Sequence, residues 1–468
     1  MSREAVLMQS RMPIFSLLSC ERELSPKERL FSDRDIMKMA APLFVEQVLV
    51  VLLGLSDTFM VSFIGEAAVS GVALVDQFNL IFLYLSIALG AGGAVIVSQY
   101  LGAGDRAKGN RAAGQLFMSA CLLAIAAGGL IWLFHRPLLA FLFGQVESDV
   151  MGAVLYLTIV LFSYPALGIY NAGTAIQRSL GNTKVTMKIA AVSNVLNIAG
   201  NFIGIFVLQA GVAGAAVPTV LARWFSAMAI TVITFRANQP VFYEWRNIFT
   251  WDGSMLRRIL GVAVPNAVES SFFQLMKVAL ITIIALFGTA QIAANGVAQS
   301  IWSVAAMFGV TMGYIFITVI GRCMGAGEVK AADFYFRKLS RMTLFISAVW
   351  NLVVLGLTLF ILPFYPLADE TKELVILLVI LHNICNALFF PFSQSLSSGL
   401  RAAGDVRVTM YISIFATLCR VAFAVILGIY LNLGVIGVAL AMCLDWLIRA
   451  VLMIRRWQSG IWKTKQLI

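Results

Sequence analysis

The sequence predicts an all-α membrane protein in which twelve transmembrane helices form two six-helix lobes. Composition is the first observation behind this fold class. Hydrophobic residues make up 60% of the chain and charged residues 12%, against roughly 25% charged residues in ordinary soluble domains. The apolar residues gather in long runs, each close to the ~20 residues with which a helix crosses a ~30 Å hydrocarbon core. Such a chain is expected to lie in a bilayer.

An internal repeat is the second observation. The stretch SLGNTKVTM at 179–187 returns as AAGDVRVTM at 402–410, so Gly181 corresponds to Gly404 at an offset of 404 − 181 = 223. The same offset aligns GAGD at 102–105 with GAGE at 325–328, and Pro42 with Pro265. An offset that holds over most of the chain indicates that a whole unit was duplicated.

Six apolar runs in the first half predict six spans, and the offset predicts six more. They are expected near residues 38–62, 72–99, 112–135, 150–172, 186–208, 212–235, 260–286, 295–320, 340–364, 373–395, 409–431 and 435–455. An even number of spans in each half gives the copies one orientation, so the repeat is parallel. The predicted parts are a cytoplasmic N-terminal segment at 1–36, a first lobe at 37–235, a cytoplasmic linker at 236–258, a second lobe at 259–456 and a cytoplasmic tail at 457–468.

The loops on the two sides of the predicted membrane differ in charge. Basic residues gather on one side: Arg106, Lys108, Arg111, Arg178, Lys184, Arg236, Arg246, Arg257, Arg258, Lys330, Arg337 and Lys338. The other side offers Glu66, Glu147, Asp149, Asp369, Glu370 and Glu373 against Arg136 and Lys372. Cytoplasmic loops carry the excess of Lys and Arg, so both termini are predicted in the cytoplasm. The net charge of +11 reflects this bias and does not indicate a nucleic-acid partner.

Span 1 holds two acids in APLFVEQVLVVLLGLSDTFMV, Glu46 and Asp57. Their separation of 11 residues, at ~100° per residue, leaves them within ~20° of one helix face. Because a charge at the bilayer centre costs ~2.5–3.5 kcal/mol on insertion scales, that face is predicted to look into protein or water. Glu46 recurs as Glu269, which fits either a shared structural hydrogen bond or a role in transport. Asp57 corresponds to Leu280, so a duplicated scaffold does not require it and a functional role is predicted.

Span 5 repeats an amide at i, i+3 and i+7, with Asn194, Asn197 and Asn201 on a single face. Buried amides can merely hold helices together. Alternatively, they supply hydrogen bonds to Asp57 and complete a proton or cation site, in which Na⁺ at Asp57 is one option and no other metal ion is expected. Asp76 in span 2 is either solvated near a span end or part of the same site.

Polar residues of the second half extend the predicted substrate cavity. Lys277 is either a fixed partner for an acid or part of the cavity, and His382 is either structural or titrating. The residues assigned to the cavity are Glu46, Asn194, Lys277, His382, Asn386 and Arg420.

Enzyme signatures are missing from the chain. HExxH, GxSxG and GxxxxGK[ST] do not occur, and there are only two histidines. The six cysteines are scattered, without metal-ligand spacing. No enzyme activity and no cofactor are expected, so transport would draw on an ion gradient.

The segments GLSDTFMVSFIG, VSQYLGAGD, SLGNTKVTM, SNVLNIAGN and VPNAVESSFFQLMKVAL resemble the multidrug and toxic compound extrusion (MATE) transporters of bacteria, from about residue 36 to residue 456. The resemblance implies efflux of organic cations or drugs in exchange for H⁺ or Na⁺ across the cytoplasmic (inner) membrane. It also implies ion-coupling roles for Asp57, Asn197, Asn201 and Glu269. Some sodium-coupled members carry the span 7 acid one turn later and an Asp on span 10. This chain has neither, which favours protons.

The main hypothesis is therefore a secondary active exporter of cationic small molecules, expected as a monomer among membrane lipids. One alternative is a flippase for a lipid-linked or polar precursor, whose cavity would need several basic residues to hold phosphate. Another is a non-transporting membrane receptor or assembly factor, against which stands the lack of a sizeable soluble domain.

Overall fold

The computed structural model describes residue 24 and residues 29–143, 147–364 and 367–468. This part of the chain forms helices joined by short connections and contains no strand. It divides into two compact units, an N-terminal unit of residues 41–267 and a C-terminal unit of residues 1–40 and 268–468. Both boundaries fall inside long helices, close to Pro42 and Pro265. The predicted lobes instead begin at 37 and 259, so the units are offset from them by a few residues.

The N-terminal unit contains most of the helix at Asp33–Ser62 and the first part of the helix at Gly253–Ala285. Its elements are α3 (Asp33–Ser62), α4 (Glu66–Gly102), α5 (Arg106–Phe143), α6 (Glu147–Leu161), α7 (Tyr164–Ser179), α8 (Thr183–Phe202), η2 (Ile203–Val207), α9 (Ala213–Thr234), α10 (Trp245–Phe249) and α11 (Gly253–Ala285). Within this unit α4 packs on α5, α6 and α7, while α9 packs on α7 and α8.

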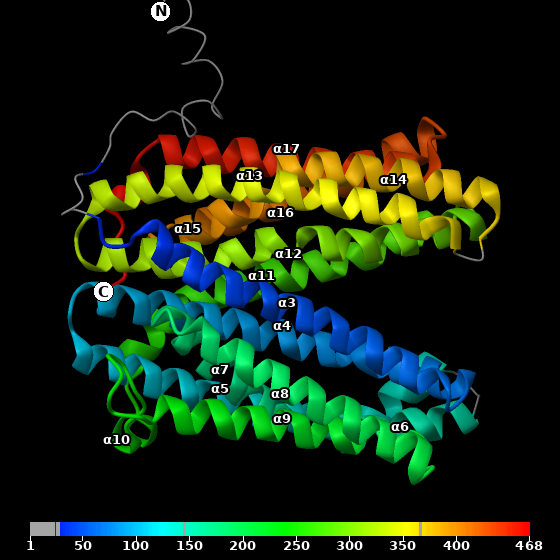
Figure 1. The fold of residues 1–468 in the computed structure, drawn as a ribbon, viewed down its shortest axis with the longest axis horizontal. Coiled ribbons are helices and arrows are strands. Elements are labelled where there is room, and N and C mark those ends of the chain that lie inside the picture. The colour runs from blue at the N-terminus through cyan, green and yellow to red at the C-terminus, as the bar shows by residue number, and fades with distance from the viewer. Residues whose placement is uncertain (1–23, 25–28, 144–146, 365–366) are drawn as a thin grey trace, which may run out of the picture. The chain divides into compact units, whose positions relative to one another are not determined.

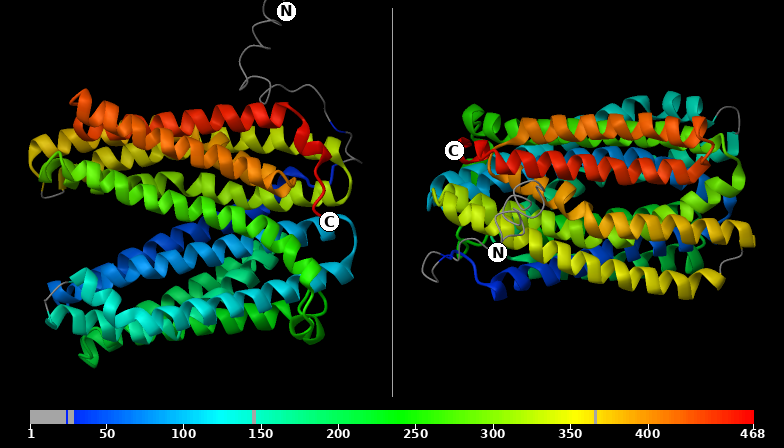
Figure 2. Two further views of the ribbon diagram at one scale, coloured as in Figure 1. Left: turned by 180° about the vertical axis from the view of Figure 1, so that it is seen from behind. Right: turned by 90° about the horizontal axis from the view of Figure 1, so that it is seen from above.

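The C-terminal unit repeats this arrangement. Its further elements are α12 (Thr289–Gly325), α13 (Val329–Ile361), η3 (Leu362–Phe364), α14 (Asp369–Leu388), η4 (Pro391–Ser395), α15 (Leu396–Ala402), α16 (Val406–Phe423), η5 (Ala424–Tyr430), α17 (Gly434–Gln458) and η6 (Ile461–Thr464). Here α12 packs on α13, α14 and α15, and α16 packs on α17. Within each unit the long helices run lengthwise beside one another (Figures 1 and 2).

The prediction of twelve spans is confirmed. Eleven helices in the described ranges are long and apolar enough to cross a membrane. The twelfth is the pair α6 and α7, which bends by 48° at a short break. The structure also lengthens several spans at the ends that the sequence predicts to be cytoplasmic. Arg178, which was predicted to lie in a loop, instead lies in the last turn of α7.

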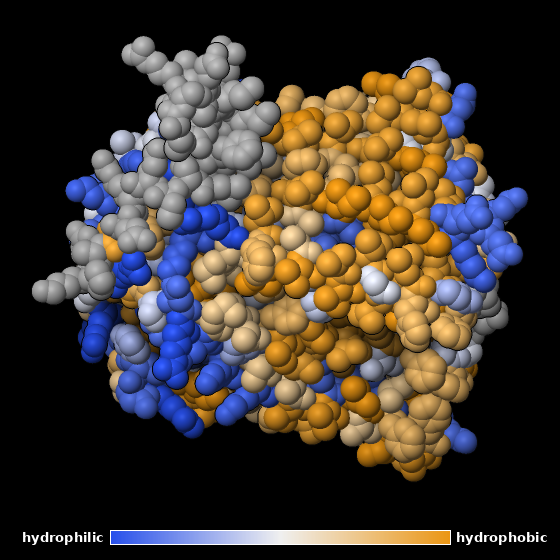
Figure 3. Space-filling view, turned by 45° about the horizontal axis from the view of Figure 1, so that its top comes forward, coloured by the Kyte–Doolittle hydropathy of each residue, from blue (hydrophilic) through white to orange (hydrophobic). Residues whose placement is uncertain are grey.

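The surface agrees with a bilayer environment. The face in Figure 3 carries a broad area of hydrophobic residues, with hydrophilic residues gathered to either side of it. On α13 the most exposed large apolar side chains are Phe345, Leu352 and Phe360, which are 71%, 70% and 71% exposed. They recur every seven or eight residues and so share one helix face. That face is suited to contact with lipid rather than water.

The linker between the repeats is ordered and packs on α5. Asn110 donates to Glu244 at 2.6 Å, and Gln115 donates to the carbonyl oxygens of Asn247 and Thr250 at 2.9 and 2.7 Å. Asp252 then begins α11 by accepting hydrogen bonds from the backbone N–H groups of Ser254 and Met255. The bond from Met255, together with those from Ser254, holds the pKa of Asp252 below its usual range.

Candidate functional site

A cavity of about 360 Å³ lies in the N-terminal unit among α3, α4, α8 and α9. It is lined by Gly54, Asp57, Thr58, Val61, Val69, Val72, Ala73, Asp76, Gln77, Tyr156, Asn201, Ala215, Thr219 and Arg223. We call it the acidic pocket, because two carboxylates and one guanidinium line it.

The amides of α8 hold the Asp57 carboxylate in this pocket. Asn201 donates from Nδ2 to Asp57 Oδ1 at 2.7 Å and to Asn197 Oδ1 at 3.0 Å. Asn197 in turn donates to the hydroxyl of Thr219 on α9 at 3.1 Å. Of the amide row, Asn201 therefore contacts Asp57 directly, and Asn197 contacts it only through Asn201. Asn194, one turn earlier, instead donates to the carbonyl oxygen of Leu49 at 2.7 Å.

Asp76 and Arg223 complete the acidic pocket. Asp76 accepts a hydrogen bond from Asn79 at 3.0 Å, and Arg223 donates to Ser163 at 2.8 Å. The sequence left the role of Asp76 open and did not single out Arg223. Arg223 lies within an apolar span, and its position in the other repeat (223 + 223 = 446) holds Trp446. The test of asymmetry that identified Asp57 would have found it.

Glu46 forms an ion pair that both repeats share. Its carboxylate accepts hydrogen bonds from Arg178 of α7 at 2.7 Å and from Thr186 of α8 at 2.6 Å. In the C-terminal unit Arg401 donates to Glu269 at 3.0 Å, and 178 + 223 = 401. Since Thr186 and Asn201 both belong to α8, Glu46 and Asp57 face the same helix, as their spacing predicted. Neither glutamate is among the residues that line the two described pockets.

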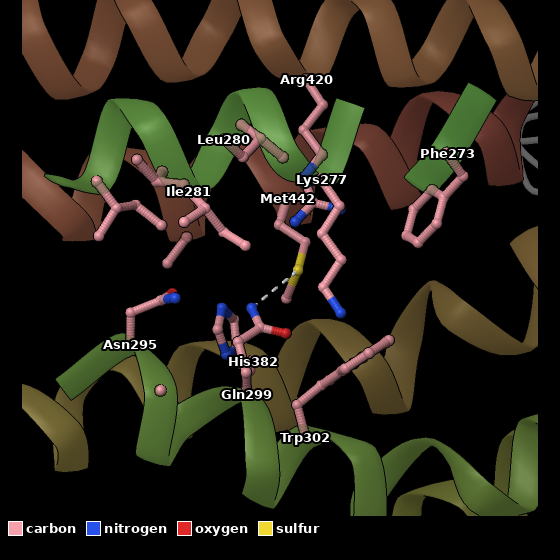
Figure 4. Close-up of a pocket in the computed structure, with 14 residues that line it drawn as sticks. Phe273, Lys277, Leu280, Ile281, Asn295, Gln299, Trp302, His382, Arg420 and Met442 are labelled. Carbon is pink, nitrogen blue, oxygen red and sulfur yellow. Dashed lines mark hydrogen bonds between the residues drawn. The ribbon is translucent and has the colours of Figure 1, made fainter. Parts of the chain in front are cut away.

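The C-terminal unit holds a second cavity, of about 230 Å³ (Figure 4). Its lining residues are Phe273, Lys277, Leu280, Ile281, Ile284, Asn295, Gly296, Gln299, Trp302, His382, Arg420, Val438, Ala439 and Met442. We call it the basic pocket, since Lys277, His382 and Arg420 line it and none of these fourteen residues carries a carboxylate. Asn386, which the sequence assigned to the cavity, is not among these residues. Its amide donates to Asn351 at 2.9 Å.

Comparisons with known proteins place this architecture among transporters. The chain is 27% identical to the uncharacterized transporter YisQ of Bacillus subtilis over 448 residues, which cover 94% of this chain and 96% of that protein. It is 26% identical to the probable multidrug resistance protein NorM of Thermotoga maritima, with 95% and 96% covered.

Solved structures share the fold. An outward-facing multidrug resistance transporter of the MATE family superposes with a TM-score of 0.83 at 20% identity. The superposition covers 95% of this chain and 100% of that one. A transporter from Pyrococcus furiosus, described as having a binding pocket of reverse polarity, superposes with a TM-score of 0.82 at 21% identity, with 95% and 100% covered.

The repeat itself is a family feature. The MatE family matches the chain twice, at residues 42–203 and 265–426. These ranges differ by the offset of 223 and contain the pocket-lining residues of both units, except for those on α9 and α17, which lie outside the matched ranges. The protein is therefore a member of the MATE family of multi-pass membrane transporters.

Proposed function

We propose that this protein is a secondary active efflux antiporter that exports organic cations in exchange for protons or sodium ions. The observation that carries the proposal is the pair of carboxylates, Asp57 and Asp76, in one cavity of the N-terminal unit. With Arg223 as the only guanidinium there, the ionised pocket carries an excess negative charge and attracts a cation. Relatives named as multidrug resistance proteins support the export of drugs.

The contacts of Asp57 support its role as the coupling carboxylate. One of its oxygens accepts the bond from Asn201, while Asn201 Oδ1 is buried without a hydrogen-bond partner among the described residues. A proton on the carboxyl group or a sodium ion between these oxygens can each fill the site. A substrate cation competes for the same carboxylate. Ion and substrate then exclude one another, which gives the differential binding that exchange requires.

The two glutamates support a division of roles. Glu46 and Glu269 each hold an arginine at the equivalent place of the repeat. A pair that serves both halves equally fits a structural role for Glu269, and we assign ion coupling to Asp57 with Asn197 and Asn201. We also propose a bacterial inner-membrane location, both termini in the cytoplasm, and a monomeric functional unit.

A flux assay tests this proposal. Purified protein in liposomes is given a proton gradient or a sodium gradient, separately, and the movement of ethidium is followed by fluorescence. We expect counter-movement of ethidium with one of the two gradients and none when that gradient is collapsed. The proposal is wrong if no cation moves with either gradient across a broad panel.

The flippase alternative gains one observation, the basic pocket of the C-terminal unit, because Lys277 and Arg420 suit a phosphate group. The same liposomes distinguish it. Transfer of a fluorescent lipid phosphate between leaflets, without any ethidium flux, would favour the flippase.

A further inference from the structure

The two pockets occupy equivalent places in the two repeats. Adding 223 to nine residues of the acidic pocket gives nine residues of the basic pocket. The pairs are Gly54 and Lys277, Asp57 and Leu280, Thr58 and Ile281, Val61 and Ile284, Val72 and Asn295, Ala73 and Gly296, Asp76 and Gln299, Ala215 and Val438, and Thr219 and Met442. The two cavities are therefore copies of one ancestral cavity, and the differences between their lining residues show how their charge has diverged.

Those differences reverse the charge. Both carboxylates of the acidic pocket are lost, since Asp57 is replaced by Leu280 and Asp76 by Gln299. A positive charge is gained where Lys277 replaces Gly54. A second is gained where Arg420 stands at the position of Asn197, and the arginine of the first pocket becomes Trp446. The loss of that arginine removes one positive charge, but the loss of two carboxylates and the gain of two cations outweigh it, so the second cavity is positive overall.

Neither cation of the basic pocket forms an ion pair with a described residue. Lys277 makes no ion pair or hydrogen bond with a described residue, and its side chain is exposed. Arg420 is 7% exposed, and its guanidinium lies 6.0 Å from the centroid of the Phe273 ring. Asp445, the acid whose charge acts on Arg420, already accepts hydrogen bonds from Arg449 through both oxygens, at 3.1 and 3.4 Å.

Hydrogen-bond donors also lack acceptors here. Buried nitrogen atoms of Trp302, His382 and Arg420 have no hydrogen-bond partner among the described residues. His382 is 1% exposed, and both of its ring nitrogens, one a donor and one an acceptor in the neutral imidazole, lack a partner among the described residues. Gln299 donates only to the sulfur of Met442, at 3.9 Å, which is a weak acceptor (Figure 4). By contrast, the buried atom without a partner in the acidic pocket is an oxygen, Asn201 Oδ1.

The rest of the lining is apolar. Leu280, Ile281, Ile284 and Val438 form one part of the wall, and Lys277 reaches from α11 toward Gln299 and Trp302 of α12 (Figure 4). A volume of about 230 Å³ is a little below the ~300–1,000 Å³ of pockets for drug-sized ligands. It suits a small molecule or one end of a larger one.

We propose that the basic pocket is a binding site for an organic anion, in which Lys277, Arg420, His382 and Gln299 surround a carboxylate or phosphate group and the apolar wall contacts its hydrocarbon part. The anionic oxygens supply the acceptors that the pocket lacks, and two positive charges balance the ligand. The transporter thus handles ligands of opposite charge at two equivalent sites. This proposal concerns binding in the C-terminal unit and does not depend on cation efflux.

Calorimetry on the full-length protein in phosphatidylcholine nanodiscs tests the site with three matched probes, 2-naphthoate, 2-naphthamide and 2-naphthylmethylammonium. They share one aromatic body and differ in charge. We expect naphthoate to bind about tenfold or more tightly than the neutral amide, as charge-assisted hydrogen bonds allow, and the ammonium probe to bind elsewhere. Equal affinities of naphthoate and naphthamide, or no binding of naphthoate, would overturn the proposal.

Repeat-guided variants locate the binding. Lys277→Gly and Arg420→Asn install the residues of the other repeat, and each should lower the affinity for naphthoate about tenfold or more. Gln299→Asp removes no cation but restores the acid of the first pocket, so it should also abolish naphthoate binding. Arg407→Gln is the control, because Arg407 is an exposed cation on the same helix as Arg420. An equal loss in Arg407→Gln, or full affinity in Gln299→Asp, contradicts the assignment.

Two further arms identify the source of the anion. Inorganic phosphate is added as a competitor, and the nanodiscs are prepared with phosphatidylglycerol beside phosphatidylcholine. If the binding of naphthoate is weakened only by phosphatidylglycerol, the site binds a lipid headgroup. If the binding of naphthoate is weakened only by inorganic phosphate, or by neither addition, the natural ligand is a dissolved organic anion. Ethidium flux is measured separately on the same variants, so a failure of this proposal is distinguishable from a failure of cation efflux.

Discussion

At the scale of single residues, comparison between the repeats separates structural charges from functional ones. Glu46 and Glu269 keep the same arginine partner in both units, at 2.7 and 3.0 Å. Asp57 and Asp76 have no acidic counterpart. A charge that is needed for folding is expected in both copies of a duplicated scaffold, whereas a charge that serves chemistry in one unit is needed only there.

The first prediction concerns the shared ion pairs. Glu46→Gln and Glu269→Gln should each lower the free energy of unfolding by about 1–3 kcal/mol, because each weakens a charge-assisted hydrogen bond between groups that are largely withdrawn from solvent. The loss is measured as a fall in Tm of the detergent-solubilised protein. Both variants that remain folded should still drive ethidium efflux.

The opposite result would reassign Glu269. If Glu269→Gln keeps the wild-type Tm but loses gradient-driven efflux, then Glu269 belongs to the coupling machinery, as the family resemblance implies. Glu46→Gln is the matched control in the other unit, since Glu46 pairs with the arginine at the equivalent position of the repeat.

The sequence predicts the Asp57 site because its evidence is local. Asp57 is alone in its repeat, and the amides of α8 share a helix face, so their meeting requires only that α3 and α8 be neighbours. The bond between Glu46 and Arg178 was missed because 132 residues separate the partners. Nothing in local spacing says that the last turn of α7 reaches α3. Arg178 and Arg401 do share the offset of 223, and this would have marked both as structural.

At the scale of helices, the described repeats share irregular ends that the sequence did not predict. Helix α8 ends in the π-helical turn η2, and α16 ends in η5. Both are followed by glycines that let the next helix approach closely. A Cβ on Gly204 would lie 2.2 Å from the carbonyl oxygen of Gly214, and one on Gly437 would lie 2.6 Å from the backbone nitrogen of Gly428. Hydropathy locates a span but says little about such contacts.

The second prediction concerns this close approach. Gly214→Ala should destabilise the protein by about 1–3 kcal/mol, because the added methyl group meets backbone that cannot rotate away. Thermal unfolding measures the effect. Gly129→Ala is the control on α5, where a Cβ would meet nothing within 4 Å, and it should leave Tm unchanged or raise it, since alanine favours helix. Equal Tm values for Gly214→Ala and the wild type would show that α8 and α9 do not pack this closely.

At the scale of the whole molecule, the described helices agree with the predicted spans, and the duplicated family match agrees with the parallel repeat. Orientation in the membrane stays a prediction from charge. Cytoplasmic ends of spans carry Lys and Arg, so the start of α5 with Lys108 is expected inside and the start of α14 with Glu370 outside.

The third prediction tests this topology. Single cysteines at Lys108 and Glu370, in a background without native cysteines, are exposed to a membrane-impermeant maleimide in intact cells. Both native side chains lie at exposed positions, so access depends on the side of the membrane. Labelling is expected for Glu370→Cys alone. Labelling of Lys108→Cys from outside would show that the orientation in the membrane is the opposite of the predicted one.

The central claim is that one carboxylate of the acidic pocket couples the ion gradient to efflux. Asp57→Asn keeps the shape of the side chain and its place beside Asn201 but removes the negative charge and the exchangeable proton. Leu280→Asn introduces the same amide at the equivalent position of the C-terminal unit and serves as the matched control.

The most direct measurement is gradient-driven ethidium efflux in proteoliposomes that contain equal amounts of folded wild-type protein, Asp57→Asn or Leu280→Asn. We predict that Asp57→Asn abolishes the gradient-driven component, while Leu280→Asn retains it with at most a loss of stability from disturbed packing. Efflux by Asp57→Asn at the wild-type rate, with the same ion dependence, would contradict the account and place coupling elsewhere in the chain.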